Sequence, residues 1–250
     1  MKRLIILSIL VFFSVSYFGQ KAQVKTCSAG RFEQDIFPTA TKKTVQYASN
    51  TDWNGEKVTL SMDIFMPDND TATNRPLVIF AHGGGYVQGS KEDMEYSCKD
   101  FAKKGFITAT IQYRLIPLDK IYDSQNMLHE IVKAMSDMKA AIRYFRESIA
   151  NGNPYKIDGN FIFVGGASAG AITALHVGVL DVDDVLPVDF KRFIDEDGGF
   201  EGNTKTAENK QFSTKIRGII NYSGGLYKEE WLDKGDPPIF SYTQQRISLR

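Results

Sequence analysis

Residues 161–170 read Phe-Ile-Phe-Val-Gly-Gly-Ala-Ser-Ala-Gly, an apolar run followed at once by small residues around Ser168. The run predicts a buried strand, and the small residues favour a sharp turn into a helix. A Gly-x-Ser-x-Gly turn of this kind, the nucleophile elbow, presents the serine hydroxyl at the end of a strand. A serine hydroxyl is a weak nucleophile alone, so it needs a base and a group that orients the base. The stretch therefore predicts an α/β sheet and Ser168 as a catalytic nucleophile.

A second glycine-rich turn follows another apolar run earlier in the chain. Residues 77–80 are Leu-Val-Ile-Phe, and residues 82–86 are His-Gly-Gly-Gly-Tyr. A continuous apolar run is typical of a strand buried on both faces, and ligand sites gather where parallel strands end. Glycines there let backbone amides approach a substrate oxygen, so Gly83 and Gly84 are predicted oxyanion donors. The amide of Ala169, at the start of the following helix, is the predicted third donor.

The remaining periodicities predict alternating strands and helices. Apolar residues at every second position over residues 58–64 predict a strand, which forms an opening hairpin with residues 44–48. Helical spacing over residues 91–104, between two apolar runs, predicts a parallel strand, helix, strand unit. Further helices are expected at 125–150 and 169–180, and further strands at 106–111, 216–222 and 238–242. This order indicates a mostly parallel sheet with helices on both faces.

A polar, acidic stretch interrupts this pattern between residues 181 and 211. It contains several glycines and five carboxylates expected to be solvated: Asp181, Asp183, Asp184, Glu196 and Asp197. We predict an excursion from the sheet rather than a separate domain. Arg114 and Arg143, which lie outside this stretch, are expected to form structural ion pairs.

The composition excludes some classes of function. The chain has 250 residues, 42% hydrophobic and 24% charged, with 30 basic and 30 acidic side chains and a net charge of zero. This is typical of one globular domain, and it gives no support for electrostatic capture of nucleic acid. No metal-ligand cluster or cofactor motif is predicted, so no metal or cofactor is expected.

The N-terminus predicts export. Lys2-Arg3 precedes an apolar stretch from Leu4 to Phe18, which is shorter than the roughly 20 residues needed to span a bilayer. We therefore expect a signal peptide at 1–22, a leader segment at 23–43, and a secreted or periplasmic domain at 44–250. An uncleaved anchor is the alternative. Cys27 and Cys98 are the only cysteines, and the sequence leaves open whether they pair.

The two turns together resemble those of the α/β-hydrolase carboxylesterases in the esterase/lipase, hormone-sensitive-lipase-like group. The likeness covers residues 58–242, and within them Tyr113-Arg114-Leu115 is a further matching segment. The resemblance implies a mostly parallel eight-stranded sheet and hydrolysis of small-molecule or carbohydrate-linked esters through an acyl-enzyme on Ser168. It also implies that His82 holds the oxyanion loop in shape, that Gly85 belongs to the same loop as a further possible donor, and that Tyr86 borders the substrate pocket.

The C-terminal region departs from this family. In related esterases the triad acid and histidine follow a strand like that at 238–242, whereas no Asp, Glu or His follows Asp236 here. The chain is therefore expected to be a truncated or frame-shifted form, without the last strand and helix and without the triad acid and histidine. The apolar residues at 239 and 240 would then lie on an uncovered edge.

The sequence positions of the other histidines and carboxylates do not suit them to replace the triad acid and histidine. His176 lies eight residues beyond Ser168 on one helix, about 12 Å along its axis. His129 is expected to be a surface or satisfied helix residue. Asp233 and Asp236 precede the last strand, at its wrong end for the site.

Three functions therefore stay open at this point. The first is a secreted serine carboxylesterase that is impaired or inactive in the present chain. The second is a non-catalytic binding module, or a decayed gene product, of the same fold. The third is a serine peptidase of the same fold, although the His-Gly-Gly-Gly loop favours esters.

Overall fold

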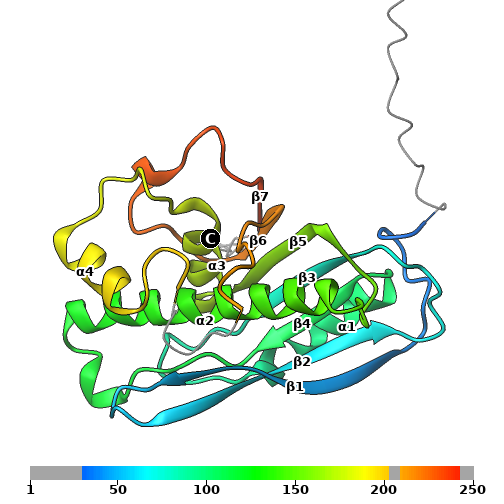
Figure 1. The fold of residues 1–250 in the computed structure, drawn as a ribbon, viewed down its shortest axis with the longest axis horizontal. Helices are drawn as coiled ribbons and strands as arrows, with labels where there is room; N and C mark the ends of the chain where they lie inside the picture. Colours follow the sequence, from blue (N-terminus) through cyan, green and yellow to red (C-terminus); the bar gives the residue numbers. More distant parts are fainter. Residues whose placement is uncertain (1–29, 203–208, 243–250) are drawn as a thin grey trace, which may run out of the picture.

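A computed structural model describes residues 30–202 and 209–242, which form one mixed sheet covered by helices (Figure 1). The order of the described strands is β1-β2-β4-β3-β5-β6-β7. They are β1 (Ala40–Thr51), β2 (Lys57–Pro67), β3 (Arg75–Ala81), β4 (Ile107–Ile111), β5 (Ile157–Ala167), β6 (Gly218–Tyr222) and β7 (Ile239–Tyr242). Strands β1, β2 and β4 pair antiparallel, and the pairings from β4 through β3, β5 and β6 to β7 are parallel. The predicted α/β class and the opening hairpin are confirmed.

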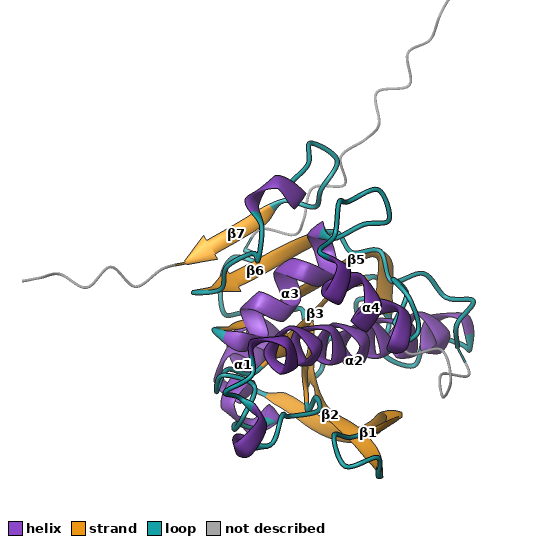
Figure 2. Cartoon of the chain, turned by 90° about the vertical axis from the view of Figure 1, so that its left-hand side faces the viewer, coloured by secondary structure: helices purple, strands orange, loops and turns teal. Residues whose placement is uncertain are grey.

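Helices cover both faces of the sheet (Figure 2). They are α1 (Glu95–Lys103), α2 (Ser124–Ala150), α3 (Ala169–Val179) and α4 (Val188–Glu196), with short 3-10 turns at Lys91–Met94, Leu118–Lys120 and Glu229–Trp231. Side chains of β3 alternate between two cores: Leu77 and Ile79 pack toward α2 and α3, whereas Val78 and Phe80 pack toward α1. This two-sided burial explains the continuous apolar run that predicted the strand.

The polar stretch after α3 contains a helix that the sequence prediction missed. Helix α4 buries Phe190, Phe193 and Ile194 and packs against α2. The spacing of these residues, i, i+3 and i+4, places them on one face of the helix. The expectation that Asp197 is a solvated carboxylate is wrong, because it is only 6% exposed.

Residues ahead of β1 also contact the domain. Arg31 forms an ion pair with Asp70 at 2.6 Å, and the ring of Phe32 packs edge-on against Phe106. Residues 1–29, which include the predicted signal peptide and Cys27, lie outside the described residues. Cys98, on α1, is a buried free thiol.

The sheet face on the α1 side leaves an apolar groove near β7. The groove has a volume of about 340 Å³ and is lined by Val78, Phe101, Phe106, Phe163, Ile220 and Phe240. Phe240 is 62% exposed. Exposed apolar strand edges favour association between chains.

We therefore expect Phe240→Ser to reduce self-association of the protein. Sedimentation velocity at several concentrations measures this effect. Tyr96→Ser is a matched control, since Tyr96 is an 83% exposed aromatic on α1 that does not line the groove. Equal behaviour of Phe240→Ser and the unmodified chain would show that the groove does not drive association.

Candidate active site

Ser168 lies in a strained turn between β5 and α3. Its φ is 51° and its ψ is −116°, a backbone conformation that residues other than glycine rarely adopt. The Ser168 amide donates to the carbonyl of Tyr222 on β6 at 2.9 Å, which anchors the turn to the neighbouring strand. The side chain of Ser168 is exposed to solvent. The structure thus presents a strained serine at the carboxyl end of the parallel strands.

The glycines on either side of Ser168 allow the turn to touch β3. A Cβ at Gly170 would lie 2.1 Å from the carbonyl oxygen of Ala81, and a Cβ at Gly166 would lie 2.5 Å from the same oxygen. Both distances are impossible for a side chain, so only glycine fits at the two positions. This requirement explains the small residues in the elbow and fixes its distance from the end of β3.

The predicted oxyanion loop lies directly against the elbow. A Cβ at Gly83 would stand 3.5 Å from the Ser168 Cβ. Gly84 has a φ of +109°, and a Cβ there would lie 2.0 Å from the carbonyl oxygen of Gln88, so this turn also requires glycine. Ala169 begins α3, where backbone amides have no partner within the helix. The structure therefore brings Gly83, Gly84 and Ala169 to one place beside Ser168.

His82 is fully buried beneath this loop. Its Nδ1 donates to the carbonyl of Gly83 at 2.7 Å, and its Nε2 accepts from the Gln112 amide at 3.4 Å. Its ring stacks on Tyr113, whose hydroxyl donates to the His82 carbonyl at 2.9 Å. Burial lowers the pKa of His82, which favours the neutral ring that these contacts require. Both ring nitrogens hold the loop, so neither is free to act as a base toward Ser168.

The side chain of Tyr86, another residue of this loop, is also buried beneath it. It is 2% exposed, and its hydroxyl meets the Thr173 hydroxyl at 3.1 Å. The expected role of Tyr86 as a pocket residue stays a prediction. Gly85, next to it, is exposed at the surface of the same loop.

The two other histidines have partners of their own. In His176, Nδ1 donates to the Ile172 carbonyl at 2.8 Å, and Nε2 accepts from the Tyr227 amide at 3.2 Å. His129 contacts Asp197 at 3.0 Å through Nε2 and stacks on Phe193. Within the described part of the chain, no histidine or carboxylate is hydrogen-bonded to the Ser168 hydroxyl. The described residues therefore bring the predicted nucleophile and the predicted oxyanion donors together, and none of their histidines or carboxylates is in place as a base for Ser168.

A buried charge cluster lies on α2, α4 and the segment after β4. Arg114 pairs with Asp137 at 2.9 Å and with Asp197 at 3.3 Å, while Asp197 also contacts His129 and Lys133. Burial acts to raise the pKa of Asp197, but the His129 hydrogen bond and the neighbouring cations hold the pKa below its usual value. Asp197 is thus a structural residue, and the predicted ion pair of Arg114 is confirmed.

The second predicted arginine behaves differently. The Arg143 side chain donates to the backbone carbonyl of Glu201, and no carboxylate among the described residues lies within ion-pair distance of it. The predicted ion pair of Arg143 is therefore wrong for the described part of the chain. Burial lowers the pKa of Arg143.

Glu130 is a buried carboxyl at the edge of this cluster. Trp53 Nε1 donates to its Oε2, whereas Oε1 has no hydrogen-bond partner among the residues that the structure describes. Burial raises the pKa of Glu130 to about 8. The folded state therefore holds a proton between pH 4.5 and 8 that the unfolded state releases, so the free energy of unfolding falls as pH rises through this range.

Glu130→Gln is expected to flatten this part of the stability profile, since the amide does not titrate. The largest possible difference in slope is about 1.4 kcal/mol per pH unit. Urea unfolding at pH 5.5, 6.5 and 7.5 measures it, with the exposed Glu56→Gln as control. An unchanged slope in Glu130→Gln would mean that this carboxyl is already ionised in the folded protein.

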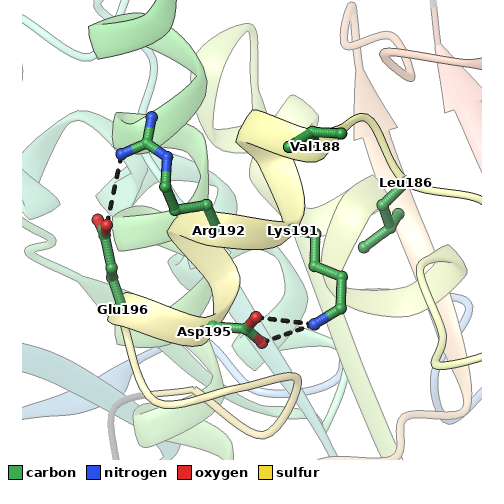
Figure 3. Close-up of a pocket in the computed structure, with 6 residues that line it drawn as sticks. All are labelled: Leu186, Val188, Lys191, Arg192, Asp195 and Glu196. Carbon is green, nitrogen blue, oxygen red and sulfur yellow. Dashed lines mark hydrogen bonds and ion pairs between the residues drawn. The ribbon is translucent and has the colours of Figure 1, made fainter.

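A surface hollow beside α4 is separate from this chemistry (Figure 3). It measures about 540 Å³, and its lining residues are Leu186, Val188, Lys191, Arg192, Asp195 and Glu196. Its charges pair with one another, Lys191 with Asp195 at 2.7 Å and Arg192 with Glu196 at 3.4 Å. These ion pairs account for all four charged side chains that line the hollow.

Neither a metal cluster nor a membrane-spanning helix is present in the part of the chain that the structure describes. No group of three or more His, Cys, Asp or Glu residues there is arranged to hold a metal ion. No helix over the same residues combines the length and apolar character needed to cross a membrane.

Comparisons with known proteins place these features in a family. The BD-FAE family model matches residues 62–234. The Arabidopsis thaliana protein named Probable carboxylesterase 3 is 29% identical over 215 residues, which is 77% of this chain and 62% of that protein. The para-nitrobenzyl esterase of Bacillus subtilis (strain 168) is 28% identical over 120 residues, covering 46% of this chain and 24% of that enzyme. The chain thus spans less than two thirds of either relative.

Solved structures agree on the fold. Thermogutta terrifontis esterase 2 phosphorylated by paraoxon aligns with a TM-score of 0.54 and 21% identity, covering 84% of this chain and 72% of that one. The fold and the relatives define an α/β hydrolase of the esterase/lipase group, as the sequence resemblance predicted. Within that group, the chain belongs to the BD-FAE family.

Proposed function

We propose that the protein is a serine carboxylic-ester hydrolase that forms an acyl-enzyme on Ser168. The observation that supports this most is the contact between the strained serine and the Gly83 turn. This closeness supports a site in which the amides of the loop stabilise the oxyanion that forms when Ser168 attacks an ester carbonyl. The two curated relatives named above are both esterases.

In the proposed reaction, the Ser168 oxygen forms a bond to the ester carbonyl carbon and releases its proton to a base. The carbonyl oxygen becomes an oxyanion, which the amides of Gly83, Gly84 and Ala169 stabilise. Breaking the bond to the alcohol oxygen, which takes up a proton, leaves the acyl group on Ser168, and water then hydrolyses it. One oxyanion donor is worth about 10² to 10³ in rate in well-studied hydrolases.

The substrate class follows from this chemistry. We propose small-molecule or carbohydrate-linked carboxylic esters, because the relatives act on esters and the site requires only an accessible carbonyl. Activated p-nitrophenyl esters of increasing acyl length test this proposal. A p-nitroanilide with the same acyl group separates an esterase from a peptidase.

Stoichiometric labelling by a fluorophosphonate tests the mechanism. We expect one phosphonyl group per folded chain, located on Ser168 by peptide mass spectrometry. Prior heat denaturation is the control, since labelling of the denatured chain is non-specific. Lack of labelling in a sample that melts cooperatively would contradict the proposal.

A non-catalytic binding module is the second candidate. The observation that favours it is that His82, His129 and His176 all contact groups other than Ser168. A binding module would retain ester ligands without turnover and would leave Ser168 unlabelled. The same labelling experiment, followed by calorimetric titration with a non-hydrolysable ester analogue, separates the two functions.

We also propose that the protein is exported. The support is Lys2-Arg3 followed by the apolar stretch from Leu4 to Phe18. Expression of the full chain with a C-terminal tag should give a shortened product outside the cytoplasm, and its N-terminal sequence should begin close to residue 23. A full-length product retained on the membrane would support the uncleaved anchor instead.

A further inference from the structure

The oxyanion donors come from two different elements. Gly83 and Gly84 belong to the loop after β3, whereas Ala169 belongs to α3. Over the described residues, no backbone hydrogen bond joins the 82–87 loop to α3. The pairing of β3 with β5 brings the two elements together, and side chains can set the orientation of the loop relative to α3.

Tyr86 and Thr173 make such a connection. The Tyr86 hydroxyl lies 3.1 Å from Thr173 Oγ1, and Thr173 Oγ1 donates to the Ala169 carbonyl at 3.0 Å. A threonine hydroxyl has one proton, which Thr173 gives to Ala169, so Tyr86 must be the donor in the first bond. Burial raises the pKa of Tyr86, which keeps its hydroxyl protonated for this purpose. The chain of bonds runs from the loop into the first turn of α3.

The backbone of Tyr86 is held in a conformation that it would not adopt alone. Its φ is 65°, which is unfavourable for a bulky aromatic residue. Its carbonyl accepts from the Ile116 amide at 2.9 Å, and its ring packs edge-on against Tyr113. Tyr86 and Thr173 are 2% and 0% exposed, so water does not compete for the bond between them. These contacts hold the backbone of Tyr86 in its unfavourable conformation.

We propose that Tyr86 and Thr173 are positioning residues, which fix the Gly83 and Gly84 amides relative to the Ala169 amide so that all three face one oxyanion. This inference rests on the proposed function for its catalytic consequence, but the hydrogen-bond connection exists without it. The connection acts on the transition state rather than on substrate binding, since the donors are needed most where charge develops.

Three variants test the proposal. Tyr86→Phe and Thr173→Val each remove a hydroxyl with little change in shape, while Thr173→Ser retains it. We expect the first two to lower kcat for a p-nitrophenyl ester, and the rate of fluorophosphonate labelling, about tenfold with KM changed less than twofold. Thr173→Ser should stay within twofold of the unmodified chain. The double variant should lose no more than either single one, because both remove the same connection.

A second readout does not need activity. Hydrogen exchange of the amides at 84–88 should accelerate at least fivefold in Tyr86→Phe and Thr173→Val but not in Thr173→Ser. Tyr155→Phe is the matched control, since Tyr155 is a 4% exposed tyrosine bonded to the Tyr144 hydroxyl at 3.0 Å, outside the loop. If the unmodified chain does not label, the proposed function fails and the exchange experiment alone decides the connection. Unchanged loop exchange, or an equal effect of Tyr155→Phe, would overturn the inference.

Discussion

Ser168→Ala is expected to abolish fluorophosphonate labelling and nearly all ester hydrolysis while leaving the domain folded. The serine side chain is exposed and makes no hydrogen bond within the described residues, so its removal disturbs no packing. In studied serine hydrolases, loss of the nucleophile lowers kcat by about 10⁶. Labelling stoichiometry should fall from one to zero, and only the residual turnover that oxyanion donors and substrate binding provide, about 10³ to 10⁴ over water in studied enzymes, should remain. Residual labelling at another residue in Ser168→Ala would contradict the assignment.

Ser168→Gly is the informative partner of this variant. Glycine adopts a positive φ without a steric penalty, whereas alanine keeps the Cβ and therefore the strain. Because φ is 51°, we expect the free energy of unfolding of Ser168→Gly to exceed that of Ser168→Ala by about 1 kcal/mol. Urea unfolding measures this difference. Equal stability of the two variants would show that the turn stores no strain, even if both lack activity.

Much of the fold could be predicted because its signals are local. The continuous apolar run in β3 and the small residues around Ser168 each reflect a requirement that a short stretch must satisfy alone. The contacts of Gly166 and Gly170 with the Ala81 carbonyl show why the elbow tolerates no side chain there. Local spacing likewise predicted α2 and the helical segment at 91–104, which ends before Gly105, where φ is +101°.

Features that depend on partners distant in the sequence could not be predicted. Asp197 looks like one more carboxylate in an acidic stretch, and only the fold brings Arg114 to it across 83 positions. The bond between Tyr86 and Thr173 likewise spans 87 positions. Helix α4 did carry a local signal in Phe190, Phe193 and Ile194, but three apolar residues among many charges are a weak pattern.

Arg114→Met is expected to destabilise the protein by about 3–5 kcal/mol. The side chains of Arg114, Asp137 and Asp197 are 2%, 0% and 7% exposed, so the variant leaves two buried carboxylates without their main cation. Arg114 also donates to the backbone carbonyls of Thr51 and Lys133, and these bonds would be lost as well. Urea unfolding followed by tryptophan fluorescence, with circular dichroism as second probe, measures the change.

Arg192→Met, at an exposed arginine, is the control for Arg114→Met. It shows whether the loss of stability comes from removing a buried arginine or from removing any arginine charge. Arg192 is 46% exposed and pairs with Asp189 and Glu196, so its removal should cost less than about 1 kcal/mol. Arg114→Met combined with Asp137→Leu should recover part of the stability, because the second change removes one unpaired carboxylate. If the two side chains do not act as a pair, the losses in free energy of unfolding caused by Arg114→Met and Asp137→Leu should simply add in the double variant. Since Arg114 directly follows Tyr113, which supports His82, recovery of stability without recovery of labelling would show that the pair also holds the oxyanion loop.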